Sequence, residues 1–229
     1  MTEKVNQISR EQLVEQLTAD LPASKQRFNV YILLLGWVSL AWLFSISLTL
    51  FQAPLRPSWF EQLTTSPQFI LEMSLGFSVI VLVALVTFQK AVPGLSRASL
   101  FWGTLVVTIL WITTLLAEIY YPPFAPSMEG KRALCDLEVV AYSLPLMFFG
   151  FLVLKKGFVL NWTLVGFGIG LVSGFIPAVL MQLACMYDPS HALQCHILPA
   201  VFVSGVGTLI GFFLKMMAGK KKHSLNSNR

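Results

Sequence analysis

The stretch LACMYDPSHALQCHILP, residues 183–199, joins the last two apolar segments of the chain and determines where they turn. It places two cysteines, two histidines and an aspartate within twelve residues, although the whole chain has only three cysteines and three histidines. The remaining cysteine, Cys135, begins another apolar segment in EGKRALCDLE. If the apolar segments cross a membrane alternately, these two regions lie on the same face. We therefore expect all three thiols on one side of a membrane.

The composition places the chain among integral membrane proteins. It is 55% apolar and 12% charged, with a mean hydropathy of +0.71, whereas roughly a quarter of the residues of a soluble domain carry charge. Six continuous apolar runs are each long enough for a helix to cross the hydrocarbon layer. We expect an all-α membrane protein with a bundle of six transmembrane helices over residues 28–217. The predicted spans are residues 29–51, 68–88, 99–117, 137–154, 160–184 and 197–217.

The distribution of lysine and arginine predicts the orientation. Thirteen of the sixteen basic residues lie in the leader (1–27), the second and fourth connections and the tail region, which ends in a basic segment over residues 218–229. The positive-inside rule then places both termini in the cytoplasm and the cysteine-rich turn outside. This bias accounts for the net charge of +5, so we expect membrane lipids and not nucleic acid as direct partners.

The leader contains one amphipathic segment, ISREQLVEQLTADL, residues 8–21. Leu13, Leu17 and Leu21 recur every four residues with Val14 beside them, and Ser9 followed by Gln12 forms a capping box, so a short helix is predicted. Its apolar stripe has three possible places: the membrane surface, the cytoplasmic ends of the bundle, or the groove of a soluble partner. A second short helix is predicted in the first outer connection, at residues 59–63.

Four acidic residues are predicted at the outer ends of the spans, on the thiol side: Glu72, Glu118, Asp136 and Glu138. Carboxylates are unfavourable inside a membrane, so their position needs a partner. One explanation is pairing with the nearby basic residues 131 and 132, or contact with lipid headgroups. The other is a polar cavity, shared with the thiols, that takes a cation or relays protons.

Small residues predict close packing of the last spans. Gly166, Gly170 and Gly174 follow a spacing of four in the fifth span, and Gly207 and Gly211 repeat it in the sixth. Such stripes let neighbouring helices approach closely. Close packing of spans four to six would bring the three cysteines together.

The thiols allow two chemistries. In an oxidising compartment, two of three cysteines commonly form a disulfide and leave one thiol over. Alternatively, thiolate and imidazole suit a soft metal ion such as zinc, cadmium or cuprous copper. There is no Cys-x-x-Cys pair, Walker loop or His-Glu-x-x-His motif, so an enzyme is not predicted. The candidate ligands are Cys135, Cys185, Asp188, His191, Cys195 and His196.

Several motifs carry a family resemblance along nearly the whole chain: EQLVEQLTADLP in the leader, SPQF and VPG around the second span, GKRALC before the fourth, and the stretch 183–199. With these the chain resembles the NrsF-type integral membrane anti-sigma factors of proteobacteria. The family pattern has one cysteine opening span four and one closing span five, here Cys135 and Cys185, followed by an Asp-Pro turn and a His-x-x-Pro. Cys195 departs from the pattern, because an aromatic residue more often precedes that histidine.

The resemblance implies a multi-pass protein of the bacterial inner membrane that holds an extracytoplasmic-function sigma factor. We expect the regulatory thiols, Cys135 and Cys185 with Cys195 as a third, to sense a soft divalent metal or an oxidant. The sigma factor would bind the leader through Leu13, Val14, Leu17 and Leu21. The alternative is a small ion or metal transporter that uses the outer carboxylates and thiols.

Overall fold

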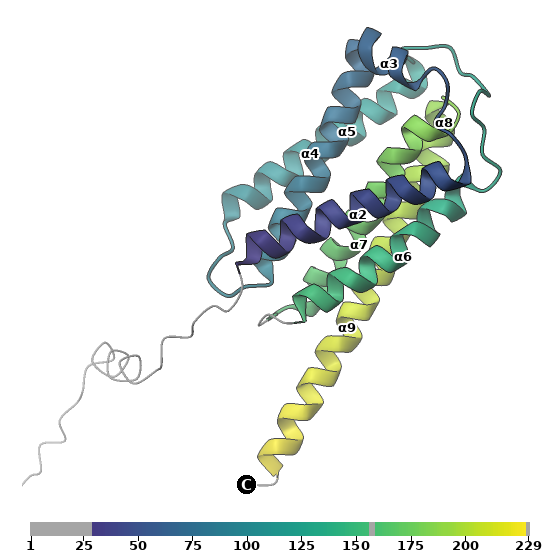
Figure 1. Cartoon of the computed structure of the whole chain (residues 1–229). Helices are drawn as coiled ribbons and strands as arrows, with labels where there is room; N and C mark the ends of the chain where they lie inside the picture. The colour runs from purple at the N-terminus through teal and green to yellow at the C-terminus, as the bar shows by residue number, and fades with distance from the viewer. Residues whose placement is uncertain (1–28, 156–158, 228–229) are drawn as a thin grey trace, which may run out of the picture.

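The computed structural model describes residues 29–155 and 159–227, and within this part every regular element is a helix (Figure 1). The predicted leader helix lies outside the described residues. Six of the helical segments are long and apolar enough to cross a membrane, so the chain is a multi-pass membrane protein. The elements are α2 (Val30–Gln52), α3 (Trp59–Thr65), α4 (Pro67–Lys90), α5 (Ala98–Tyr120), α6 (Cys135–Leu154), α7 (Trp162–Ala184), α8 (Pro189–His191), the π-helical turn η1 (Ala192–Ile197) and α9 (Leu198–Ser227).

The predicted spans are confirmed to within a few residues, except at the start of the last one. The sixth spanning helix begins at Pro189, whereas the sequence predicts its start at residue 197. Asp188 is the N-cap and its carboxylate accepts hydrogen bonds from the backbone of Ser190 and His191. Proline is favourable at the first helical position because it has no N–H to leave unpaired. The predicted turn is therefore mostly helical, and α3 confirms the short helix predicted in the first outer connection.

Helix α7 lies at the centre of the bundle, where it contacts α9, α4, α6 and α2 (Figure 1). Its closest neighbour is α9. A Cβ atom added at Gly170 would lie 2.6 Å from the Cα atom of Ser204, and one at Gly174 would lie 2.7 Å from the carbonyl oxygen of Ala200. The two backbones are thus in direct contact, as the small-residue stripe predicts.

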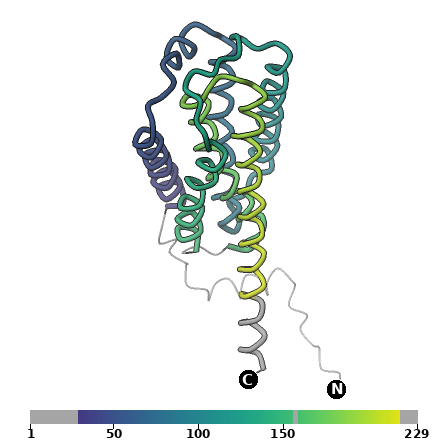
Figure 2. The backbone as a smooth tube through the Cα atoms, turned by 90° about the vertical axis from the view of Figure 1, so that its right-hand side faces the viewer, coloured from purple at the N-terminus to yellow at the C-terminus, as the bar shows by residue number. Residues whose placement is uncertain are grey.

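The connections after α2, α5 and α7 meet at one end of the bundle, here named the site end (Figure 2). Two buried arginines hold these connections together. Arg132 forms an ion pair of 3.0 Å with Glu138 and donates to the carbonyl oxygens of Ala53 and Thr49 at 2.8 and 3.2 Å. Arg56 donates from Nη1 to the carbonyl oxygen of Cys185 at 3.0 Å. Segments from both halves of the chain are therefore fixed relative to one another at this end.

Candidate functional site

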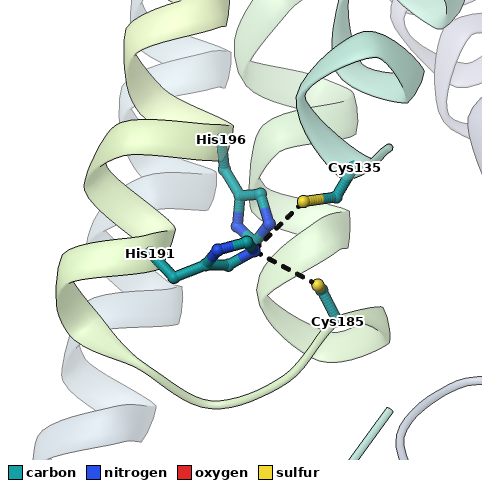
Figure 3. A group of neighbouring side chains, drawn as sticks. All are labelled: Cys135, Cys185, His191 and His196. Carbon is teal, nitrogen blue, oxygen red and sulfur yellow. Dashed lines mark hydrogen bonds between the residues drawn. The ribbon is translucent and has the colours of Figure 1, made fainter. Parts of the chain in front are cut away.

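Two thiols and two imidazoles meet at the site end (Figure 3). One ligand atom from each of Cys135, Cys185, His191 and His196 lies within 4.8 Å of all the others. The Nε2 atom of His191 is 3.0 Å from Sγ of Cys135 and 3.5 Å from Sγ of Cys185. The two imidazole rings are 5.2 Å apart and nearly perpendicular. These four residues are named the Cys/His cluster below.

Each member of the Cys/His cluster stands at a helix end or in an irregular turn. Cys135 is the first residue of α6, and Cys185 directly follows the last residue of α7. His191 lies at the end of α8, and His196 lies in η1. The cluster thus joins α6 to the hairpin formed by α7 and the last spanning helix.

The π-helical turn explains why both histidines face the thiols. In an α-helix, residues five apart point in directions about 140° apart, because each residue turns the chain by about 100°. The wider π-helical turn brings such residues closer to one face and is frequent at functional sites. Pro199 gives a cause for it, since a proline in an α-helix would clash with the carbonyl group four residues earlier, here that of Cys195.

The cluster is enclosed but not sealed. The side chains of Cys135, Cys185 and His196 are buried, while His191 is half-buried and leaves an approach from the surface. The hydrogen bond with the Cys135 thiol lowers the pKa of Cys185 below the usual range of a cysteine. This hydrogen bond favours the thiolate form of Cys185, and the thiolate is the form that binds metals and reacts with oxidants.

The donor set is that of a soft or borderline metal ion. Two thiolates and two imidazoles match the tetrahedral Cys2His2 sites of zinc, and thiolates also favour cadmium and cuprous copper. All three cysteines are free thiols in this structure. Two thiols at such close range are also placed to respond to an oxidant.

Two of the predicted metal ligands, Cys195 and Asp188, are not members of the Cys/His cluster. Cys195 packs against the cluster of Cys135, Cys185 and Met186 but is not one of the four converging residues. Asp188 caps the following helix with its carboxylate.

The four predicted acidic residues separate into different environments. Glu138 pairs with Arg132, as one of the two explanations predicts, and Asp136 is exposed. Glu72 and Glu118 are buried beside each other on α4 and α5.

The sequence reasoning missed the role of the two arginines. The sequence predicts an ion-pair partner at position 132 but no role for Arg56, yet both arginine side chains are buried and hold the segments that carry the thiols. A signal was present for Arg56: it is a lone cation in a Pro-rich connection next to an apolar span, where burial requires hydrogen-bond partners.

Residues 17–215 match the family described as "Negative regulator of sigma F". The chain belongs to this family. The match covers most of the chain, including the whole Cys/His cluster, and confirms the resemblance seen in the sequence. The family is one of regulators of a sigma factor and not of enzymes. No curated protein and no solved structure matches the chain.

Proposed function

We propose that this protein is an anti-sigma factor of the bacterial inner membrane, which retains an extracytoplasmic-function sigma factor and releases it when the Cys/His cluster binds a soft metal or is oxidised. The observation that carries the proposal is the convergence of Cys135, Cys185, His191 and His196 in a member of a sigma-regulator family. The charge bias supports an orientation with the site end outside and both termini in the cytoplasm.

Metal binding would rearrange the cluster. In a tetrahedral site with metal–sulfur bonds of about 2.3 Å and metal–nitrogen bonds of about 2.0–2.1 Å, ligand atoms lie about 3.3–3.8 Å apart. The four ligand atoms of the cluster lie up to 4.8 Å apart. The most distant atoms must therefore approach by roughly 1 Å, the difference between these two separations. Because Cys135 is the only member of the cluster that comes from α6, any adjustment of its sulfur atom to a metal ion acts on the start of α6.

The arginines offer a route from this movement to α2. Arg132 precedes Cys135 by three residues and donates to two carbonyl groups at the end of α2. Arg56, which follows α2, donates to the carbonyl group of Cys185. Both thiol-bearing segments are thus attached to the end of α2, and the leader directly precedes the other end of this helix. Packed helices have discrete arrangements, so a small shift at one end can favour a second arrangement at the other.

The leader would supply the contact with the sigma factor. Its apolar stripe, Leu13, Val14, Leu17 and Leu21, has the spacing of a helix that binds in a hydrophobic groove. These residues lie outside the described part of the chain.

The test is co-purification of the full-length, detergent-solubilised protein with the sigma factor encoded beside it, with and without cadmium or an oxidant. We expect treatment to release the sigma factor from the wild type but not from the Cys135→Ser/Cys185→Ser variant. Cys195→Ser is the matched control and should respond like the wild type. Release from the double variant would refute the role of the cluster. Failure of the untreated protein to bind the sigma factor would favour the transporter alternative.

A further inference from the structure

A second polar site lies beside the Cys/His cluster, between α4, α5 and the end of α7. It is a small cavity with a volume of about 10 Å³ for the centre of a water-sized sphere, enough for one water molecule or one small ion. Glu72, Glu118, Gln182 and Tyr187 line it, and His196 lies at its boundary with the Cys/His cluster. We name it the carboxyl cavity.

The polar groups around the carboxyl cavity lack partners. Glu72 and Glu118 are each 2% exposed, and each has one oxygen without a hydrogen bond. Gln182 is 5% exposed, and neither its amide oxygen nor its amide nitrogen has a partner. The hydroxyl group of Tyr187 is also buried and unpartnered. An unsatisfied buried polar group costs about 1–3 kcal/mol. Several such groups around one cavity therefore indicate a bound species that acts as their missing partner.

The two glutamates at the carboxyl cavity have each other, and not a basic side chain, as their nearest partner. The two carboxyl groups are close enough to interact with each other. The guanidinium of Arg56 also lies near Glu72, but its hydrogen bonds go to Cys185 and Gln62. Within residues 29–155 and 159–218, neither glutamate forms an ion pair. With both carboxyl groups ionised, two carboxylates beside one guanidinium would leave one net negative charge.

We infer that the carboxyl cavity binds one small hard cation of the Mn²⁺ or Ca²⁺ class. Carboxylate, amide and hydroxyl oxygens are the ligands that such ions prefer. A cation compensates the buried charge and gives the amide oxygen of Gln182 and the hydroxyl oxygen of Tyr187 a partner. A proton shared by the two glutamates would leave those two oxygens unsatisfied. The donor set differs from that of the Cys/His cluster, so the two sites select different ions.

The test is titration of the full-length protein in detergent with Mn²⁺, in which electron paramagnetic resonance counts the free ion. We expect one Mn²⁺ bound per chain and its displacement by excess Ca²⁺. Glu72→Gln/Glu118→Gln keeps the shape of both side chains and should weaken binding at least about tenfold, because carboxylate charge sets the affinity of such sites. Cys135→Ser/Cys185→Ser should bind Mn²⁺ like the wild type.

Three outcomes would overturn the inference. Equal Mn²⁺ binding by the wild type and the glutamate variant would overturn it, and so would the absence of binding by both, since water and a shared proton would then fill the cavity. Loss of Mn²⁺ in the cysteine variant instead would assign the ion to the Cys/His cluster. Gln182→Leu, which keeps both charges, separates ligation from folding: it should weaken Mn²⁺ binding while the protein elutes as a folded species in size-exclusion chromatography.

Discussion

The contact between α7 and α9 makes Gly207→Ala the sharpest test of the packing. A Cβ atom at position 207 would overlap the carbonyl oxygen of Gly166 and lie 3.1 Å from the Cα atom of Gly170. Both obstacles are backbone atoms, which cannot rotate away as a side chain can. Overpacking of this kind costs about 1–3 kcal/mol. The control is Gly205→Ala on the same helix, where the added Cβ has nothing within 4 Å.

The pair of variants isolates the clash from the backbone effect. Replacing glycine by alanine in a helix is worth about 0.8–1.0 kcal/mol in favour of alanine, and this term is common to both variants. The difference between Gly207→Ala and Gly205→Ala in the free energy of unfolding should therefore be about 1–3 kcal/mol, the overpacking term alone.

The measurement is reversible unfolding of the detergent-solubilised protein by increasing fractions of sodium dodecyl sulfate, followed by circular dichroism. We expect Gly207→Ala to unfold at a lower fraction than the wild type, and Gly205→Ala at an equal or higher one. Equal unfolding of the two variants would refute the direct backbone contact between α7 and α9.

Three further predictions concern the proposed signal. His191→Asn should weaken cadmium binding at least about tenfold in a competitive chelator titration, because loss of even an outer-shell partner of a metal ligand has an effect of this size. Cys195→Ser is the control and should bind cadmium like the wild type. Equal affinities of His191→Asn and the wild type would show that His191 is not a ligand. Arg132→Met should bind cadmium but no longer release the sigma factor in the co-purification assay, and intact release would exclude this route. Leu17→Asp should lose the sigma factor without any metal, while the control Gln16→Asp, on the predicted polar face of the leader, should retain it. Unchanged retention by Leu17→Asp would show that the apolar stripe of the leader does not bind the sigma factor.

The six spans and the meeting of the thiols were predictable because both depend on patterns that the sequence displays directly. Apolar runs of about 20 residues specify spanning helices in a membrane. Alternate crossing then places Cys135 and Cys185 at the same end. The glycine stripe predicted the contact of α7 with α9, since only small residues permit such an approach.

The details of the site were not predictable from these patterns. Residues 188–190, Asp-Pro-Ser, are typical of a turn, yet the segment that they begin is helical because Asp188 caps it and Pro189 suits a first turn. The π-helical turn that aligns His191 with His196 has no composition signal beyond Pro199. Glu72 lies beside Glu118 and not beside Glu138 because α4 packs against α5. The order of the spans along the chain does not determine which helices are neighbours.

The packing of α2 differs from that of α7 in a way that bears on the proposed signal. Most residues of α7 are buried, whereas the buried residues of α2 form one stripe at intervals of three or four residues. The end of that stripe nearest the site contains Ser45 and Thr49, whose buried hydroxyl groups have no partner. Few specific contacts therefore fix the position of α2 along its axis, apart from the bond of 3.1 Å from Trp37 Nε1 to the carbonyl oxygen of Leu146. A displacement of the arginine-linked connections is expected to shift α2 before it disturbs α7, because α2 has fewer interactions to break.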